Sequence, residues 1–234
     1  MLFGWFYYDW TILIVLPAFF FAMWAQMRVK SSFEEYGKVR SSSGLTGAEA
    51  ARRLLDANGL YHVSIAMTRG HLTDHYNPKD ETLYLSDSVH NSTSVAAIGV
   101  ACHEAGHAIQ HATGYGALQL RMGIIPICNV GSRLAMPLFL IGLLFAGNFG
   151  YLFMLLGIAC FSLATLFQLI TLPVEFNASR RALEGIENHN LLYRDETEGA
   201  KKVLSAAALT YVAALATSLL SLLRLIVIAN NRRR

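Results

Sequence analysis

Four long apolar runs dominate this sequence and limit the folds that it can adopt. At 1.5 Å per helical residue, about 20 apolar residues cross a hydrocarbon core of ~30 Å. The four runs are close to that length or exceed it, and the first contains no charged residue. They cover residues 10–27, 122–146, 149–172 and 203–229. We therefore predict a mainly α-helical, multi-pass membrane protein.

The composition supports this prediction. Hydrophobic residues make up 54% of the chain and charged residues only 15%, whereas soluble domains are about 25% charged. Such a composition excludes a disordered chain and provides too few charges to cover a soluble globule. The net charge of +3 is small and the basic residues do not gather on one face, so we expect no nucleic-acid partner.

The first apolar run has two interpretations, a retained anchor and a cleaved signal peptide. No Lys or Arg precedes it, Asp9 lies there instead, and no clean A-x-A site follows it. These features argue against a signal peptide. Aromatic residues near its start suit an interfacial belt, and they are Trp5, Tyr7, Tyr8 and Trp10. We predict an N-terminal membrane anchor at residues 1–27.

The second and third runs predict a helical hairpin around a tight turn at Gly147-Asn148. The first member of the hairpin is interrupted by Asn129, Ser132 and Arg133. Because a charged side chain is expensive in lipid, Arg133 should face protein or lie near an interface.

The distribution of basic residues predicts the orientation of the spans. With four spans, residues 28–121 and 173–202 face the same side, and they hold nine and five Lys or Arg residues. The positive-inside rule then places both segments in the cytoplasm. The C-terminal arginines, Arg232, Arg233 and Arg234, disagree with this rule unless the fourth run is not a full span.

The longer polar segment contains the signals of a small α+β domain. The sequence Thr46-Gly-Ala-Glu49 is a capping box that opens a helix over residues 47–58. Two short strands are expected at residues 63–67 and 82–86, with a polar connection between them. Another helix should begin near residues 91–94 and end at about Ala112.

This last helix contains an H-E-x-x-H motif formed by His103, Glu104 and His107. A spacing of four residues places both imidazoles on one face of a helix, where they can bind one zinc ion. Glu104 is placed to reach a water molecule on the metal rather than the metal itself. The motif therefore predicts metal-assisted peptide hydrolysis with Glu104 as the general base.

A catalytic zinc ion usually has three protein ligands, so one is missing from the motif. Glu175 is the best candidate, because it follows the third apolar run on the same side of the membrane as the motif. Pro173 suits the first turn of a new helix. That helix would carry Glu175 on one face with Ala178, Ser179 and Ala182, and these small residues would allow close packing against the motif helix.

Other third ligands remain open. His111 continues the i, i+4 series, but it lies ~6 Å further along the helix than His107, so one straight helix cannot wrap all three histidines around one ion. Glu175 itself could serve only the dipole of its helix. The remaining candidates are His75, His189, Glu184 and Glu187.

The motifs resemble a known family. HEAGHAIQH, EFNASRRA and LTDHYNP followed by LYLSDSV together resemble the YugP-type neutral zinc metallopeptidases of bacterial membranes, over residues 72–182. HExxH with a later E-x-x-A-[DS] is more distantly similar to HtpX-like and CaaX-type membrane proteases. The glutamate is the third zinc ligand there, which implies Glu175 here. Those distant relatives usually carry Asp where this chain has Ser179, and that Asp hydrogen-bonds a ligand histidine.

The resemblance also implies a substrate-side edge strand before the motif helix. This strand would bind an extended peptide by strand addition, and it would consist of Thr82, Leu83, Tyr84, Leu85 and Ser86. A packed internal strand is the alternative. His75 or Tyr76 in the LTDHYNP loop would stabilise the tetrahedral oxyanion.

We therefore expect a membrane-bound zinc endopeptidase with one Zn²⁺ per chain and a small zincin-like α+β domain in the cytoplasm. The expected parts are an anchor at 1–27, a metallopeptidase domain at 28–121, a transmembrane hairpin at 122–172, a ligand-supplying segment at 173–202, and an apolar helix with a basic tail at 203–234. The expected location is the bacterial inner membrane, with peptides or membrane proteins as substrates.

Two other functions remain possible from the sequence. An intramembrane protease of the site-2 type needs HExxH in a lipid-spanning helix and an Asp ligand from another span, but none of the four runs contains Asp. A catalytically inactive membrane adaptor with a structural zinc ion would not need the intact Glu104.

Overall fold

The computed structural model describes residues 10–70 and 72–233, and the chain divides into two compact units. Unit 1 contains Met1–Trp24, Leu120–Leu172 and Tyr211–Arg234, and unit 2 contains Ala25–Gln119 and Pro173–Thr210. Trp5, Tyr7 and Tyr8 of the predicted aromatic belt lie outside the described residues, as does Arg234 of the basic tail.

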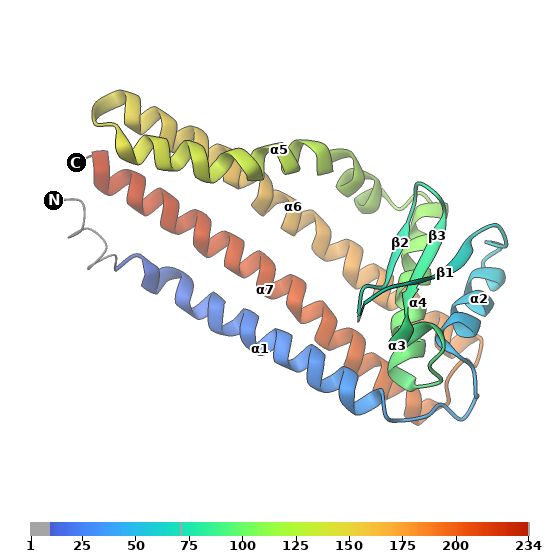
Figure 1. The fold of residues 1–234 in the computed structure, drawn as a ribbon. Helices are drawn as coiled ribbons and strands as arrows, with labels where there is room; N and C mark the ends of the chain where they lie inside the picture. Colours follow the sequence, from blue (N-terminus) through green and yellow to red (C-terminus); the bar gives the residue numbers. More distant parts are fainter. Residues whose placement is uncertain (1–9, 71, 234) are drawn as a thin grey trace. The chain divides into compact units, whose positions relative to one another are not determined.

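Four helices are long and apolar enough to cross a membrane. They are α1 (Ile12–Tyr36), α5 (Gly116–Leu144), α6 (Gly147–Asn188) and α7 (Arg194–Arg233) (Figure 1). Each contains all or nearly all of one of the four apolar runs of the sequence. The prediction of a mainly helical chain is confirmed, and four helices have the length and composition that membrane spans need.

Within unit 1, α5 and α6 form the predicted hairpin and approach each other closely at glycines. A Cβ atom at Gly157 would lie 2.7 Å from the main-chain nitrogen of Phe139, and one at Gly142 would lie 2.6 Å from the carbonyl oxygen of Gly150. Small residues of this kind let helix backbones pack together in lipid. A hydroxyl pair, Thr165 and Ser218, joins α6 to α7 over 2.7 Å.

The prediction that a new helix begins at Pro173 is wrong, because α6 continues through this residue to Asn188. A proline removes a single main-chain hydrogen bond and tends to kink a helix rather than end it when both sides are otherwise stabilised. The part of α6 after Pro173 is stabilised by packing, since Val174, Ala178 and Ile186 are fully buried.

Unit 2 holds a three-stranded sheet and the motif helix. Its further elements are α2 (Gly47–Ala57), β1 (Ser64–Thr68), β2 (His75–Asn77), β3 (Thr82–Ser86), α3 (Asp87–His90) and α4 (Val95–Ala112). The predicted capping box of α2 is present: Thr46 Oγ1 accepts from the Glu49 N–H over 3.2 Å, and Glu49 Oε2 accepts from the Thr46 N–H over 2.8 Å.

Of the two expectations for Thr82–Ser86, the edge strand is wrong and the packed internal strand is confirmed. The strand order is β1-β3-β2, so β3 is the central strand. It pairs in parallel with β1 and antiparallel with β2. Both of its edges are therefore occupied, and Thr82, Leu83, Tyr84, Leu85 and Ser86 cannot accept an added strand. Strand β2 lies in the polar connection between the two expected strands, for which no secondary structure was predicted.

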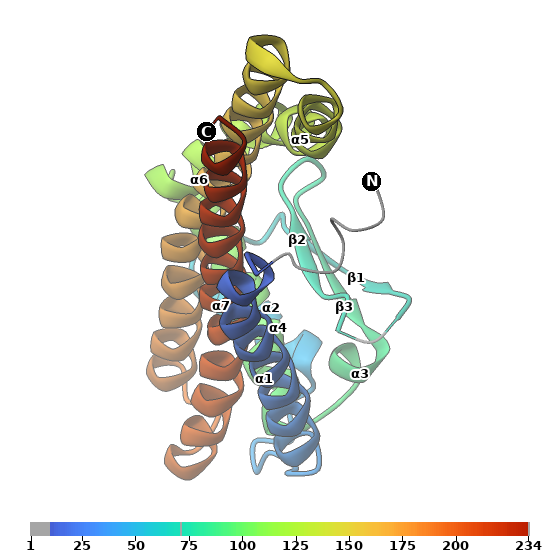
Figure 2. The ribbon, with the colours of Figure 1, turned by 90° about the vertical axis from the view of Figure 1, so that its left-hand side faces the viewer.

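Helix α4 forms the centre of unit 2, with Ala97, Ile98, Ala101 and Cys102 fully buried. A Cβ at Gly99 would lie 3.2 Å from the Cβ of Ala200, so α7 packs closely on α4. The last part of α1 and the first part of α7 lie side by side in both views (Figures 1 and 2), and Lys202 Nζ donates to the Tyr36 hydroxyl over 2.9 Å.

Candidate metal centre

Helix α4 presents both motif histidines on one face. It begins after Ser94, whose hydroxyl accepts a hydrogen bond from the Ala97 N–H over 3.2 Å, as an N-cap residue does. His103 and His107 follow one turn apart, and their ring centroids are 4.9 Å from each other. Their side chains are only 12% and 14% exposed. The predicted helical setting of HExxH is therefore present.

Glycine at position 106 lets α6 approach this face. A Cβ at Gly106 would lie 2.6 Å from the carbonyl oxygen of Ala178 and 3.3 Å from its Cα. No larger residue fits at this crossing without displacing the backbone. The close packing that we predicted from the small residues on this segment is present, and it brings Glu175 of α6 beside the two histidines.

His103, His107 and Glu175 form one compact cluster. Glu175 Oε2 lies 3.4 Å from the Nε2 atom of each histidine. One ligand atom from each of the three residues lies within 4.8 Å of the other two. Among the described residues these three form the group of His, Cys, Asp and Glu side chains suited to hold a metal ion, and Glu175 itself is buried.

The orientation of His107 is fixed by Gln110. His107 Nδ1 lies 3.0 Å from Gln110 Oε1. The amide nitrogen of Gln110 donates to the carbonyl oxygen of Val174 over 2.8 Å and to Asn177 Oδ1 over 3.0 Å. Because that end of Gln110 is a donor, Oε1 must accept, so Nδ1 of His107 carries the proton. Nε2, which faces Glu175, is then the nitrogen that can lose its proton and bind a metal ion.

Ser179 lies beside Nδ1 of His103, as Gln110 lies beside Nδ1 of His107. Its Oγ lies 3.1 Å from His103 Nδ1. The hydroxyl oxygen can accept a hydrogen bond from Nδ1–H, which leaves Nε2 of His103 available to bind a metal ion. The serine that stands where the distant relatives carry Asp is therefore in contact with a candidate ligand.

The negative charges of the cluster affect the pKa of His107. Burial alone lowers the pKa of His107. The hydrogen bond with Glu175 and the negative charges of Glu104 and Glu175 outweigh burial, so the pKa of His107 is raised above its ordinary value. The metal-free cluster thus stabilises a proton that a bound cation would displace.

Glu104 is held by strand β2. Its Oε2 atom accepts a hydrogen bond from the Tyr76 main-chain N–H over 3.2 Å. The Tyr76 hydroxyl lies 3.1 Å from His111 Nδ1. Burial, with the charges of Glu81 and Asp80, raises the pKa of Tyr76 to about 12, so its phenol stays protonated and can donate to His111. Tyr76 therefore makes hydrogen bonds to two residues of α4, Glu104 and His111.

The other candidate ligands lie outside the cluster. His111 contacts Tyr76, and the exposed ring of His75 stacks on Tyr84 with centroids 5.0 Å apart. Glu184 lies 3.8 Å from Arg180 in an exposed ion pair. His189 and Glu187 are also exposed and are not part of the group.

Three residues of the site were not predicted as such from the sequence: Gly106, Gln110 and the main-chain N–H of Tyr76. A glycine inside an otherwise helical pattern is a signal of close packing, so Gly106 could have been recognised. Gln110 gave no local signal, because its partners Val174 and Asn177 lie 64 and 67 residues away.

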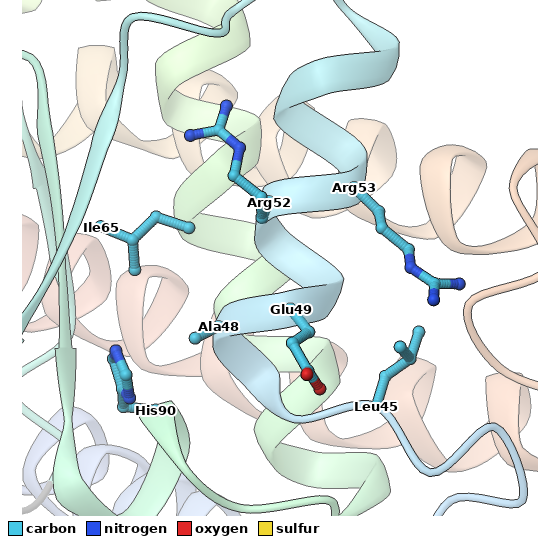
Figure 3. Close-up of a pocket in the computed structure, with 7 residues that line it drawn as sticks. All are labelled: Leu45, Ala48, Glu49, Arg52, Arg53, Ile65 and His90. Carbon is cyan, nitrogen blue, oxygen red and sulfur yellow. The ribbon is translucent and has the colours of Figure 1, made fainter.

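A separate, open pocket of about 510 Å³ lies beside α2 and β1 in unit 2 (Figure 3). Arg52 and Arg53 point to different sides of α2 there. Glu49 belongs to the capping box, and Arg52 donates to the carbonyl oxygens of Val63 and Leu60. These charged groups stabilise the fold, and no residue of the metal cluster lines this pocket.

The donors of the cluster suit zinc. Two imidazole nitrogens and one carboxylate oxygen are a ligand set of catalytic zinc sites, which keep a fourth position open. Both imidazoles have a partner at Nδ1 that leaves Nε2 available. The residues therefore fit the metal that the sequence motif predicts.

Comparisons with known proteins agree with this fit. The family model described as "Putative neutral zinc metallopeptidase" matches residues 11–230. A curated relative from Bacillus subtilis (strain 168), "Putative membrane protease YugP", is 52% identical over 222 residues, which are 95% of this chain and 97% of the relative. No solved structure matches the chain. The resemblance seen in the motifs is confirmed, and the chain belongs to the neutral zinc metallopeptidase family.

Proposed function

We propose that this membrane protein is a zinc-dependent endopeptidase with one Zn²⁺ per chain, in which His103, His107 and Glu175 bind the metal and Glu104 is the general base. The observation that carries this proposal is the convergence of the three ligand atoms within 4.8 Å, with Glu104 directly after His103 on α4. The helix with its motif and the ligand from a second helix make unit 2 zincin-like.

Each residue has a distinct task in this proposal. A bound Zn²⁺ supplies Lewis-acid polarisation of a peptide carbonyl and of a water molecule. Glu104 would take a proton from the attacking water molecule and would later give it to the leaving amine. The Tyr76 N–H holds one carboxylate oxygen of Glu104, which leaves the other oxygen for the proton. Gln110 and Ser179 keep the Nε2 atoms of both histidines directed at the metal.

The substrate strand is reassigned to β2. Since β3 is the central strand, an extended peptide can add only at β1 or β2, the two edges of the sheet. Strand β2 contacts the proposed general base, Glu104, through the main-chain N–H of Tyr76. It is therefore the edge strand that lies beside the proposed catalytic residue. We assign peptide binding to β2, with His75 and Tyr76 as contact residues. As the candidate oxyanion donor, the Tyr76 hydroxyl would exchange its hydrogen bond with His111 for one with the substrate.

The proposed location is the bacterial inner membrane, with the active site on the cytoplasmic face. The support is the excess of basic residues in segments 28–121 and 173–202. Glu175 lies three residues after the third apolar run ends at Leu172. Because Glu175 follows the apolar run so closely, cleavage would occur near the membrane surface. Suitable substrates are peptides, or membrane proteins with an extended segment near the bilayer surface.

The substitution Glu104→Gln tests the proposed function. It keeps the size of the side chain and removes the base, so the variant should retain zinc and lose peptide cleavage by about 10²-fold or more. Glu187→Gln, at an exposed position of α6, is the matched control and should cleave like the wild type. Cleavage is measured with a library of unstructured peptides on detergent-purified protein, and zinc by elemental analysis.

The same experiment separates the alternatives. A membrane adaptor with a structural zinc ion would show no cleavage in the wild type either, while its zinc content stayed at one per chain. An intramembrane protease of the site-2 type would cut a single-span substrate within its apolar segment. Helix α4 is not among the four membrane-span candidates of the described chain, so we expect cuts outside such segments.

A further inference from the structure

Helix α5 carries a polar stripe in unit 1, formed by Asn129, Ser132 and Arg133. The three residues lie at positions i, i+3 and i+4, so they share one face of the helix. All three side chains are exposed. The opposite face packs on α6, where Gly131 is buried and a Cβ there would lie 3.2 Å from the carbonyl oxygen of Cys160. The polar stripe therefore points away from the hairpin partner.

This stripe lies near the middle of the membrane segment. Gly131 contacts Cys160 of α6, and the next contact along the hairpin joins Ala135 to Gly157. Arg133 is between these two levels. Cys160 lies 11 residues, or about 16 Å, from the start of the third apolar run at Phe149. Half of a ~30 Å core is ~15 Å, which exceeds the reach of an arginine side chain, so Arg133 cannot contact lipid headgroups.

Two other arginines in the apolar helices of unit 1, Arg224 and Arg232, have partners inside the unit. Arg224 Nε donates to Thr11 Oγ1 over 3.1 Å, and Arg232 donates to the carbonyl oxygen of Leu143 over 2.7 Å. Among the described residues, Arg133 has no hydrogen bond or ion pair. A guanidinium group that faces hydrocarbon without a partner has a high free-energy cost. The polar stripe therefore requires a partner that supplies hydrogen-bond acceptors.

We propose that the polar stripe of α5 binds the transmembrane helix of another membrane protein, and that this helix carries an Asp or Glu at mid-depth. Charge complementarity favours this partner, because a carboxylate accepts a bidentate hydrogen bond from arginine and neutralises it. Asn129 and Ser132 add an amide and a hydroxyl for bonds between helices. A second copy of this chain offers no carboxylate at that depth, since its four apolar runs contain neither Asp nor Glu.

The test uses the full chain in vesicles of phosphatidylethanolamine and phosphatidylglycerol. The probe is a labelled single-span Leu/Ala helix with one central Glu, and binding is measured by Förster transfer to a labelled chain. The Glu probe should bind at least ten-fold more tightly than a probe with Gln. Arg133→Leu should weaken binding of the Glu probe at least ten-fold. This variant removes a charge from the apolar segment, so membrane insertion should not suffer.

Leu134→Ala is the control on the same helix, since Leu134 is exposed on α5 but lies on a different face from the polar stripe. It should bind the Glu probe like the wild type. Equal binding of Glu and Gln probes, or unchanged binding by Arg133→Leu, would overturn the proposal. Transfer between two differently labelled chains that depends on Arg133 and resists competition by the Glu probe would make a second copy the partner and would overturn it too.

Discussion

Gly106 of α4 lies directly against Ala178 of α6, and a Cβ at Gly106 would lie 2.6 Å from the Ala178 carbonyl oxygen. His103 and His107 flank this crossing on one helix, and Glu175 lies three residues before it on the other. The distance between the two backbones thus sets the distance between the candidate ligands. The geometry of the candidate metal centre therefore depends on Gly106, a residue that has no side chain.

Gly106→Ala should therefore damage the centre without changing any ligand. The added methyl group pushes α6 away, which should cost about 1–3 kcal/mol of stability and lower zinc affinity. Chelator competition and unfolding in detergent measure the two effects. Gly123→Ala is the matched control, since nothing lies within 4 Å of a Cβ there. Equal zinc affinity in both variants would show that the crossing does not set the ligand geometry.

Gln110→Leu should weaken zinc binding by about 10- to 100-fold, the usual loss when a ligand histidine loses its hydrogen-bond partner. Gln110 is fully buried, and its three hydrogen bonds join His107 to α6. Leucine keeps the volume but cannot accept a hydrogen bond from the Nδ1–H of His107. The exposed Gln119→Leu serves as control. Zinc dissociation constants measure the change, and an unchanged constant for Gln110→Leu would refute this role.

Two opposite changes at Ser179 should move zinc affinity in opposite directions. Ser179→Ala removes the partner of His103 Nδ1 and should weaken binding. Ser179→Asp restores the residue of the distant relatives and places a charged acceptor there, which makes a stronger hydrogen bond and should slow zinc release. Release is followed with a chromogenic chelator. If Ser179→Ala and Ser179→Asp change the rate of zinc release in the same direction, Ser179 does not act as the hydrogen-bond acceptor of His103.

Zinc affinity should fall as the pH is lowered, and the fall should begin above the ordinary pKa of histidine. Zinc binds the neutral imidazole, and the pKa of His107 in the metal-free cluster is raised. Protons therefore compete with zinc at a higher pH than they would at an isolated histidine. Zinc binding by calorimetry between pH 8 and 5 measures this, with proton release on binding as the second observable. Affinity that stays constant down to pH 6 would contradict the raised pKa.

Much of the site could be predicted because its signals are local. His103 and His107 are four residues apart, so any helix brings them together. Glu175 could be selected because it follows an apolar run on the same side of the membrane, even though the expected helix start at Pro173 was wrong. The capping box at Thr46 and Glu49 is also a local pattern, and it is present as predicted.

The features that could not be predicted depend on contacts between distant residues. Strand β2 has three residues, His75–Asn77, which is too short for an alternating pattern. Its pairing with β3, which makes β3 the central strand, is a property of the sheet and not of either segment. The role of Gln110 likewise depends on a carbonyl group of α6, 64 residues away in the chain.

The central claim is that His103, His107 and Glu175 bind one zinc ion, and the zinc content of the purified chain tests it most directly. Elemental analysis should give about one zinc per wild-type chain and much less for Glu175→Ala, because a two-histidine site binds zinc weakly. Glu184→Ala, which removes an exposed glutamate of the same helix, should keep the wild-type value. Unchanged zinc in Glu175→Ala, or none in wild type purified without chelators, would contradict the account.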